Sequence, residues 1–385
     1  MRSSITIAAA AALAAGLSAP ALAQNSVTVG ITAALTGPPA GDFAPAVAAM
    51  RIYLDRVNAK GGINGNKVNL VIEDDSAQPS KAAANAKKLL TDNPVLLINA
   101  SLSSTYAPVV AAARNAGVPL LFASSVCPKD VYPPAQASEF CTTAFGATYD
   151  SRAGLSFIKQ TAKEPVKIGF VAMAIPVSRG EVDFAAKQAP SFGMTAVANE
   201  DIPPPTADYT PYATKIKEAG ANWVWAWAPW VTEVRTFEAL RRLGWSGDYL
   251  GYEHLVSENE LRRIKDPKLY IIGADAMFEN PLPVQEEIAA AAKAAGSKYP
   301  ANEMSEGWIG GMVIEAALKA AGPNPTPAKV QAAMANLKVD LKGLRGGPLE
   351  WTKDNHFRLK QSYRVYHWDG SKVVLVKDWF SYDVK

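Results

Sequence analysis

Two clusters of hydroxyl side chains occupy positions where a protein can bind an anion. Ser103-Ser104-Thr105 lies between a predicted strand and a predicted helix, and Ser124-Ser125-Val126 follows the next predicted strand. Hydroxyl groups and the unpaired backbone N–H groups at the start of a helix together favour a negatively charged group. Open α/β sheets bind ligands at the carboxyl ends of their strands, where both clusters are expected. A helix cap is the alternative role for these serines.

The residue types that catalyse reactions in enzymes are present, but they do not form a recognised catalytic motif. The sequence has no G-x-S-x-G elbow, no phosphate-binding P-loop, no H-E-x-x-H and no C-x-x-C motif. Ser104, His254 and Glu253 are the residue types of a hydrolase triad, but neighbours in an extended segment point to opposite sides, so Glu253 would not align with His254. We therefore expect no enzymatic activity and no cofactor. A hydrolase is the remote alternative, which turnover assays would separate from stoichiometric binding.

Other polar groups are interpreted as structural. The chain has 3 histidines and 2 cysteines, too few for a zinc ribbon, an iron–sulfur cluster or a histidine-rich metal site. Asp74-Asp75 has the composition of a catalytic carboxylate pair. Its place at the end of a predicted strand favours capping of backbone N–H groups instead. No metal site is predicted.

Strands and helices alternate in the segments that must position the hydroxyl clusters. Strands are predicted over 27–35, 68–72, 95–99 and 119–122, and helices over 45–58, 80–90 and 105–115. After a proline-rich loop, strands are predicted over 166–173, 194–200, 223–228, 249–252 and 270–277, and helices over 180–189, 209–219 and 232–243. Helices near 284–295, 306–321 and 327–337 and a hairpin over 361–379 follow. This order is typical of parallel sheets with helices on both faces.

Two such runs predict an α/β protein with two doubly wound parallel-sheet lobes, a hinge and a ligand cleft between the lobes. The late helices are expected to return to the first lobe, which makes both lobes discontinuous. We expect lobe 1 to comprise 24–145 and 279–345, and lobe 2 to comprise 146–278 and 346–385. A chain of 385 residues with 49% hydrophobic and 19% charged residues supports cores of this size.

The N-terminus has the features of a secretory signal. Arg2 precedes an apolar stretch over 5–17, and Ala21-Leu22-Ala23 matches the small-x-small cleavage rule. The stretch is too short to span a bilayer, so we expect 1–23 to be a cleaved signal peptide and the remainder to reach the periplasm. The 39 basic and 36 acidic residues give a formal net charge of +3, which does not indicate binding to nucleic acid or to an anionic membrane.

Export determines how the two cysteines are interpreted. In an oxidising compartment, Cys127 and Cys141 are expected to form a disulfide that clamps the proline-rich loop between them. A reactive thiol is the alternative, but no histidine lies near either cysteine in the sequence.

Short strings along the chain resemble a known family. They are Val29-Gly30-Ile31 with Leu35-Thr36-Gly37-Pro38, then Asn58-Ala59-Lys60-Gly61-Gly62-Ile63-Asn64-Gly65, then Asp74-Asp75. In this order they resemble the leucine/isoleucine/valine-binding family of type I periplasmic solute-binding proteins, over essentially the whole mature chain. The resemblance implies a monomeric receptor whose two lobes close on a small solute and deliver it to the membrane permease of an ABC importer. A sensor that presents its loaded form to a signalling receptor is the alternative.

The same resemblance implies particular ligand contacts. Hydroxyl groups of the two clusters and the backbone near Val126 would meet a ligand carboxylate, and Phe43 would cover the ligand. Glu253, in the string Gly251-Tyr252-Glu253, would pair with a ligand ammonium group.

Two departures from the amino-acid-binding pattern bear on the choice of ligand. Relatives that bind amino acids commonly have Tyr-Gly after the first strand of lobe 2, where this chain has Arg179-Gly180. An arginine can hold a carboxylate with two hydrogen bonds. Trp223, Trp225 and Trp227 alternate onto one face of a strand, mostly in the core, and Trp227 with Trp230 at its end would form an aromatic wall.

These residues favour different ligands. Arg179 and the tryptophans favour a hydrophobic, aromatic carboxylate without an amine, whereas Glu253 favours a branched-chain or aromatic amino acid. We predict the aromatic carboxylate, with the amino acid as the close alternative.

Overall fold

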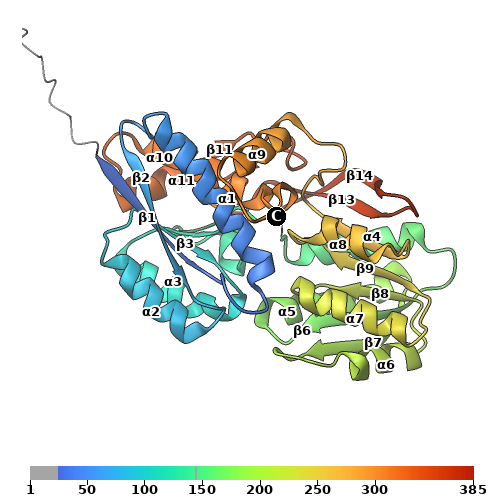
Figure 1. Cartoon of the computed structure of the whole chain (residues 1–385). Helices are drawn as coiled ribbons and strands as arrows, with labels where there is room; N and C mark the ends of the chain where they lie inside the picture. Colours follow the sequence, from blue (N-terminus) through green and yellow to red (C-terminus); the bar gives the residue numbers. More distant parts are fainter. Residues whose placement is uncertain (1–24, 144) are drawn as a thin grey trace, which may run out of the picture.

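The computed structural model describes residues 25–143 and 145–385, so the predicted signal peptide over 1–23 lies outside the described residues. Two α/β lobes lie next to each other, and the chain passes between them after β5, after β10 and before β13 (Figure 1). Within the described ranges, no helix is both long and apolar enough to cross a membrane.

The first lobe contains a five-stranded parallel sheet in the order β2-β1-β3-β4-β5. Its strands are β1 (Ser26–Ala33), β2 (Lys67–Asp74), β3 (Leu96–Ala100), β4 (Leu120–Phe122) and β5 (Glu139–Cys141). One face, with Val29 and Ile31, shares a core with α1 (Ala40–Ala59), α9 (Pro283–Ala294), α10 (Ser305–Ala321) and α11 (Pro327–Met334). The other face, with Leu97 and Phe122, packs on α2 (Pro79–Leu90) and α3 (Tyr106–Ala116). The period of two along each strand thus gives both faces a hydrophobic layer.

The second lobe contains a seven-stranded sheet in the order β14-β13-β10-β9-β8-β6-β7. The parallel strands are β6 (Lys167–Met173), β7 (Thr195–Ile202), β8 (Trp223–Ala226), β9 (Asp248–Tyr252) and β10 (Leu269–Gly273). The predicted hairpin, β13 (Lys360–Trp368) and β14 (Val373–Asp383), adds antiparallel to β10. Its helices are α4 (Thr148–Thr161), α5 (Pro176–Gln188), α6 (Thr210–Glu218), α7 (Trp230–Arg242) and α8 (Ser257–Ile264). A short ladder joins β11 (Lys338–Val339) to β12 (Leu349–Glu350).

The predicted fold class, two doubly wound parallel-sheet α/β lobes, is confirmed. The residue limits of each lobe stay a prediction. Trp223 and Trp225 are buried in the core of the second lobe, as the alternation along the strand predicted. Asp74 and Asp75 accept hydrogen bonds from backbone N–H groups of Leu35, Ser76 and Ala77, in agreement with their capping role.

Some elements were missed, and helices α1 and α5 start four or more residues earlier than predicted. Strands β5, β11 and β12 and helices α4 and α8 had no prediction; α8 buries a single apolar side chain, Leu261, so it has almost no apolar periodicity. Helix α1 begins at Ala40, ahead of Pro45, which was taken as its first residue. Helix α5 begins at Pro176 rather than at Gly180. Asp42, Phe43 and Arg179, which were expected in loops, therefore lie in the first turns of helices.

Candidate functional site

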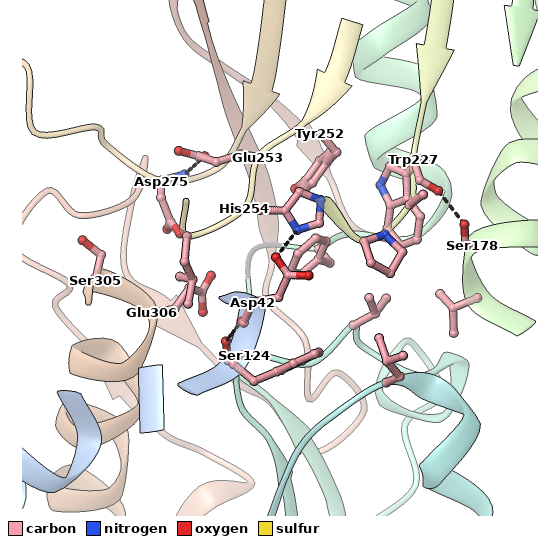
Figure 2. A pocket seen from close by; sticks show the side chains of 18 of the residues that line it. Asp42, Ser124, Ser178, Trp227, Tyr252, Glu253, His254, Asp275, Ser305 and Glu306 are labelled. Atoms are coloured by element: carbon pink, nitrogen blue, oxygen red, sulfur yellow. Dashed lines mark hydrogen bonds and ion pairs between the residues drawn. The ribbon is translucent and has the colours of Figure 1, made fainter. Parts of the chain in front are cut away.

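A cavity lies between the two lobes, at the carboxyl ends of the parallel strands (Figure 2). The first lobe lines it with Asp42, Phe43, Ser101, Leu102, Ser103, Ser124 and Val126. The second lobe lines it with Ile175, Val177, Ser178, Trp227, Tyr252, Glu253, His254 and Glu258, and the segments near the hinge add Phe145, Asp275, Met277, Ser305 and Glu306. Glu253, Asp275, Ser305 and Glu306 gather at one end of the cavity, and Trp227 and Ser178 lie at the other. The cavity therefore has an acidic end and an aromatic end.

Six of the predicted ligand-binding residues line this cavity: Phe43, Ser103, Ser124, Val126, Trp227 and Glu253. Their contact with a ligand stays a prediction. Five others do not line it: Ser104, Thr105, Ser125, Arg179 and Trp230. The structure therefore brings together about half of the predicted set.

Thr105 and Ser125 support the wall instead of facing the cavity. The Thr105 hydroxyl donates to the carbonyl oxygen of Leu102 at 2.8 Å, and the Ser125 hydroxyl donates to the carbonyl oxygen of Asn99 at 2.8 Å. Both side chains are fully buried. Their hydrogen bonds shape the two loops that present Ser103 and Ser124.

Arg179 does not line the cavity, so the geometry lends no support to the prediction that it holds a ligand carboxylate. Its Nε atom lies 2.8 Å from Asp201, and 58% of its side chain is exposed. The early start of α5 is the reason, because it places Arg179 on the outer face of a helix instead of in a loop at the cleft. Trp230 also differs from expectation: it is the first residue of α7 and packs in the core of the second lobe.

Ser103 supplies a free hydroxyl on the wall formed by the first lobe. Its buried Oγ makes no hydrogen bond within the described residues. The Ser124 hydroxyl donates to the carbonyl oxygen of Asp42 at 3.2 Å, and Ser124 itself has a left-handed φ of 58°. A buried hydroxyl without a partner costs free energy that an acceptor on a ligand would offset.

The aromatic end consists of Phe145, Trp227 and Tyr252. The ring centroid of Phe145 lies 5.1 Å from that of Tyr252 and 5.9 Å from that of Trp227. The Trp227 indole N–H donates to Asp150 at 3.0 Å, and Asp150 also accepts from the hydroxyl of Tyr363 at 2.7 Å. Burial raises the pKa of Asp150 to about 7. These bonds hold the indole in one orientation toward the cavity.

The acidic end is organised by Arg345, which lies behind the cavity wall. Its Nε donates to Asp275 at 2.7 Å, and its other nitrogens reach Glu306 and the carbonyl oxygen of Thr142. The backbone N–H of Asp275 donates to Glu253 Oε2 at 3.0 Å. Burial and the nearby carboxylate of Asp275 hold the pKa of Glu253 well above its usual range.

Most carboxylates that line the cavity have a cationic partner. Asp275 and Glu306 pair with Arg345, Glu258 pairs with Arg262 at 2.8 Å, and Asp42 faces His254 at 3.6 Å. In the parts of the chain that the structure describes, Glu253 has no ion pair, and neither lysine nor arginine lines the cavity. A group that completes the charge balance at Glu253 would carry a positive charge.

Sequence reasoning missed Phe145, Tyr252, Asp275, Ser305 and Glu306 as site residues, and it treated His254 only as a catalytic candidate. Tyr252 had a usable signal, because it stands next to Glu253 in the recognised string. Asp275 and Glu306 had none, because they come from segments far apart in the sequence that meet only at the hinge.

The predicted disulfide is present and stabilises the wall of the site. Cys127 and Cys141, 14 residues apart, are bonded, and the Thr143 hydroxyl beside them donates to the carbonyl oxygen of Ser125 at 2.6 Å. Replacement of both cysteines by alanine is expected to lower the free energy of unfolding by about 3 kcal/mol, the effect of opening a loop of about 15 residues. Urea unfolding measures the free energy of unfolding. Wild-type protein with its disulfide reduced is the control, and it should show the same loss. A double variant as stable as the oxidised protein would contradict the prediction.

Comparisons with known proteins assign the chain to a family. The sequence model described as "periplasmic binding protein" matches residues 26–372. The chain belongs to this family. It is 22% identical to the Leu/Ile/Val-binding protein BraC3 of Rhizobium johnstonii, over 94% of this chain and 97% of that protein. It is 25% identical to an amino acid binding protein of Pseudomonas aeruginosa, over 92% of each chain.

Solved structures of other proteins share the fold of this chain. A branched-chain amino acid ABC transporter protein from Thermus thermophilus with bound valine superimposes with a TM-score of 0.79 at 19% identity, covering 93% of this chain and 97% of that chain. A solute-binding protein of an ABC transporter from Rhodopseudomonas palustris BisB5, in complex with 3,4-dihydroxybenzoic acid, superimposes with a TM-score of 0.78 at 17% identity, covering 93% and 98%. At these identities the likeness concerns the fold alone.

Proposed function

We propose that this protein is the periplasmic solute-binding component of an ABC importer and that it captures an amino acid with an apolar or aromatic side chain. The unpaired carboxylate of Glu253 carries the proposal, because it offers a buried partner for an ammonium group in a cavity without lysine or arginine. The names of the relatives from Rhizobium johnstonii and Pseudomonas aeruginosa support this class of solute. The loaded monomer would deliver its solute to a membrane permease, and catalysis plays no part.

The remaining groups of an amino acid have places in the same cavity. The Ser103 hydroxyl, free of other hydrogen bonds in the described residues, would donate to the ligand carboxylate. Backbone N–H groups where β3 leads into α3 would add to this contact. The rings of Phe145, Trp227 and Tyr252 would contact an apolar side chain.

An aromatic carboxylate without an amine is the second candidate. The sequence favoured it because of Arg179 and the tryptophans, and Arg179 does not line the cavity, so one of these supports is lost. The aromatic end of the cavity still favours it, since a planar ring would stack there. Glu253, if protonated, would then hydrogen-bond to a polar substituent of the ring instead of pairing with an ammonium group.

A thermal-shift screen of ligand-stripped protein separates the two candidates. One panel contains aliphatic and aromatic L-amino acids, and the other contains benzoates, phenylacetates and phenylpyruvate. A ligand present at about 100 times its Kd stabilises the folded state by about 2.7 kcal/mol, which raises Tm by several degrees. We expect shifts with amino acids, confirmed by calorimetric titration with a stoichiometry of one. Shifts only with the amine-free acids would contradict the proposal.

A further inference from the structure

A cluster of ionisable side chains connects the two lobes beside the cavity. Asp42, in the first turn of α1, comes from the first lobe, whereas His254 and Glu233 come from the second. His254 Nδ1 lies 3.6 Å from Asp42 Oδ1, and His254 Nε2 lies 3.8 Å from Glu233 Oε1. Figure 2 shows the carboxylate of Asp42 directed at the imidazole of His254. The imidazole thus stands between carboxylates of both lobes.

The cluster is shut off from solvent while the lobes are together. The side chains of His254, Asp42 and Glu233 are 5%, 12% and 1% exposed. Rings of Phe145 and Trp230 flank the imidazole, with centroids 5.5 Å and 6.1 Å away. The backbone N–H of Trp230, in the second lobe, lies close enough to Asp42 to lower the pKa of its carboxyl group. Separation of the lobes would return Asp42 to water and remove it from His254.

We propose that Asp42 and His254 form a latch between the lobes, and that closure of the cleft takes up a proton onto this pair. In the closed arrangement a proton on the pair gives an imidazolium beside a carboxylate. Loss of that proton leaves the Asp42 carboxylate buried next to a neutral imidazole, without a cationic partner among the described residues. The closed form is therefore favoured when the pair is protonated.

In the closed form the pKa values of Asp42 and His254 are both raised above their ordinary values. Glu233 belongs to the same lobe as His254 and stays beside it in the open form, so closure adds the effect of Asp42. Burial by itself would lower the pKa of His254, but Asp42 and Glu233 outweigh it and raise that pKa above its ordinary value. Burial raises the pKa of Asp42, against the opposing effect of His254. A group whose pKa rises on closure favours the closed form at low pH and loses that contribution as pH rises through the raised pKa. Closure should thus weaken with increasing pH.

Other charged groups near the imidazole are already engaged. From α7, Glu233 also accepts hydrogen bonds from the backbone N–H groups of Ala228 and Tyr252. From α8, Glu258 pairs with Arg262 and accepts from the backbone N–H of Phe278, while the Ser257 hydroxyl accepts from the backbone N–H of His254. Asp42 is thus the charged partner that lobe separation would take away.

The test measures closure directly in ligand-free protein, so its result does not depend on the identity of the solute. Spin labels are attached at K87C on α2 and E218C on α6, both exposed and on different lobes. The native cysteines are bonded to each other and do not react. Pulsed electron resonance then gives the ratio of short to long distances between pH 5.5 and 8.5.

We expect the ratio of closed to open protein to fall as pH rises, by about tenfold for each unit by which closure raises the pKa of the pair. His254→Gln and Asp42→Asn should each remove this dependence. His367→Gln, which alters a histidine on β13 outside the cavity, should retain it. A wild-type distance distribution that does not change with pH overturns the proposal, and so does an unchanged pH profile in Asp42→Asn. Loss of solute binding without a change in these profiles would count against the proposed function alone.

Discussion

Replacement of Glu253 by Gln is expected to weaken the binding of an amino acid roughly 30-fold to several thousand-fold. The estimate follows from the loss of one partner of a buried charged pair, which costs about 2–5 kcal/mol. Glutamine keeps the shape and can still accept the hydrogen bond from the backbone N–H of Asp275. The change therefore removes the negative charge with little disturbance of the wall. Calorimetric titration of both proteins with L-leucine and L-phenylalanine measures the effect.

Glu258→Gln is the matched control, because Glu258 also lines the cavity but is already paired with Arg262. We expect a loss of affinity below tenfold for this variant, since an exposed partner makes the pair weak. Equal losses in the two variants would contradict the special role of Glu253. If the true solute lacks an amine, Glu253→Gln should bind it about as well as the wild type.

The same titrations, repeated at several pH values, provide a second test of the role of Glu253. The pKa of Glu253 is raised in the empty protein by burial and by Asp275, so a cationic ligand must displace a proton to obtain its partner. The affinity advantage of wild type over Glu253→Gln should then grow as pH rises through that raised pKa. The comparison between variants matters, because the latch at His254 acts in the opposite direction and is present in both proteins.

Arg345→Met is expected to lower the free energy of unfolding by about 3–5 kcal/mol. Arg345 is 4% exposed and holds Asp275, Glu306 and the carbonyl oxygen of Thr142. Those partners come from segments at which the chain passes between the lobes and from the start of α10. Methionine fills similar volume but leaves buried carboxylates without a cation, and removal of one partner of a buried pair costs this much. Urea unfolding measures the difference.

Arg364→Met, on strand β13, is the control for the loss of an arginine ion pair. Arg364 pairs with Asp378, whose side chain is 67% exposed, so its loss should cost less than about 1 kcal/mol. Adding Glu306→Gln to Arg345→Met should recover part of the stability, because one uncompensated charge is removed. A destabilisation by Arg345→Met no larger than that of Arg364→Met would contradict the assigned role.

The architecture was predictable because its signal is local. Alternating apolar runs and short connections identified all but one of the strands and most helices of the two parallel sheets, and the burial of Trp223 and Trp225 followed from the period of two along one strand. The elements that escaped prediction lacked this signal. Four of the eight residues of helix α8 are charged, and β5 is only three residues long.

The site was predictable in part, and the placement of Arg179 shows how a helix boundary affects such a prediction. Helix α1 runs through Pro45, in its first two turns, which was taken as its start, and helix α5 begins at Pro176, a start signal that was passed over in favour of Gly180. Because α5 begins four residues earlier than predicted, Arg179 lies on an exposed helix face, and one of the two reasons to expect an amine-free carboxylate loses its support. In lobe 1, the hydroxyl clusters were located correctly, but only the packing of the loops decided that Ser103 and Ser124 face the cavity.

The sequence by itself determined the two-lobed α/β fold, the cysteine pair and the family, because strand and helix periodicity and short strings are properties of neighbouring residues. Only the tertiary structure decided the charge of the site. Glu253, Asp275, Glu306 and Arg345 lie far apart along the chain, and no local pattern records that Asp275 and Glu306 share one guanidinium while Glu253 beside them has no ion pair within the described residues. The same holds for Asp42 and His254, which approach each other only because the lobes close around the cavity.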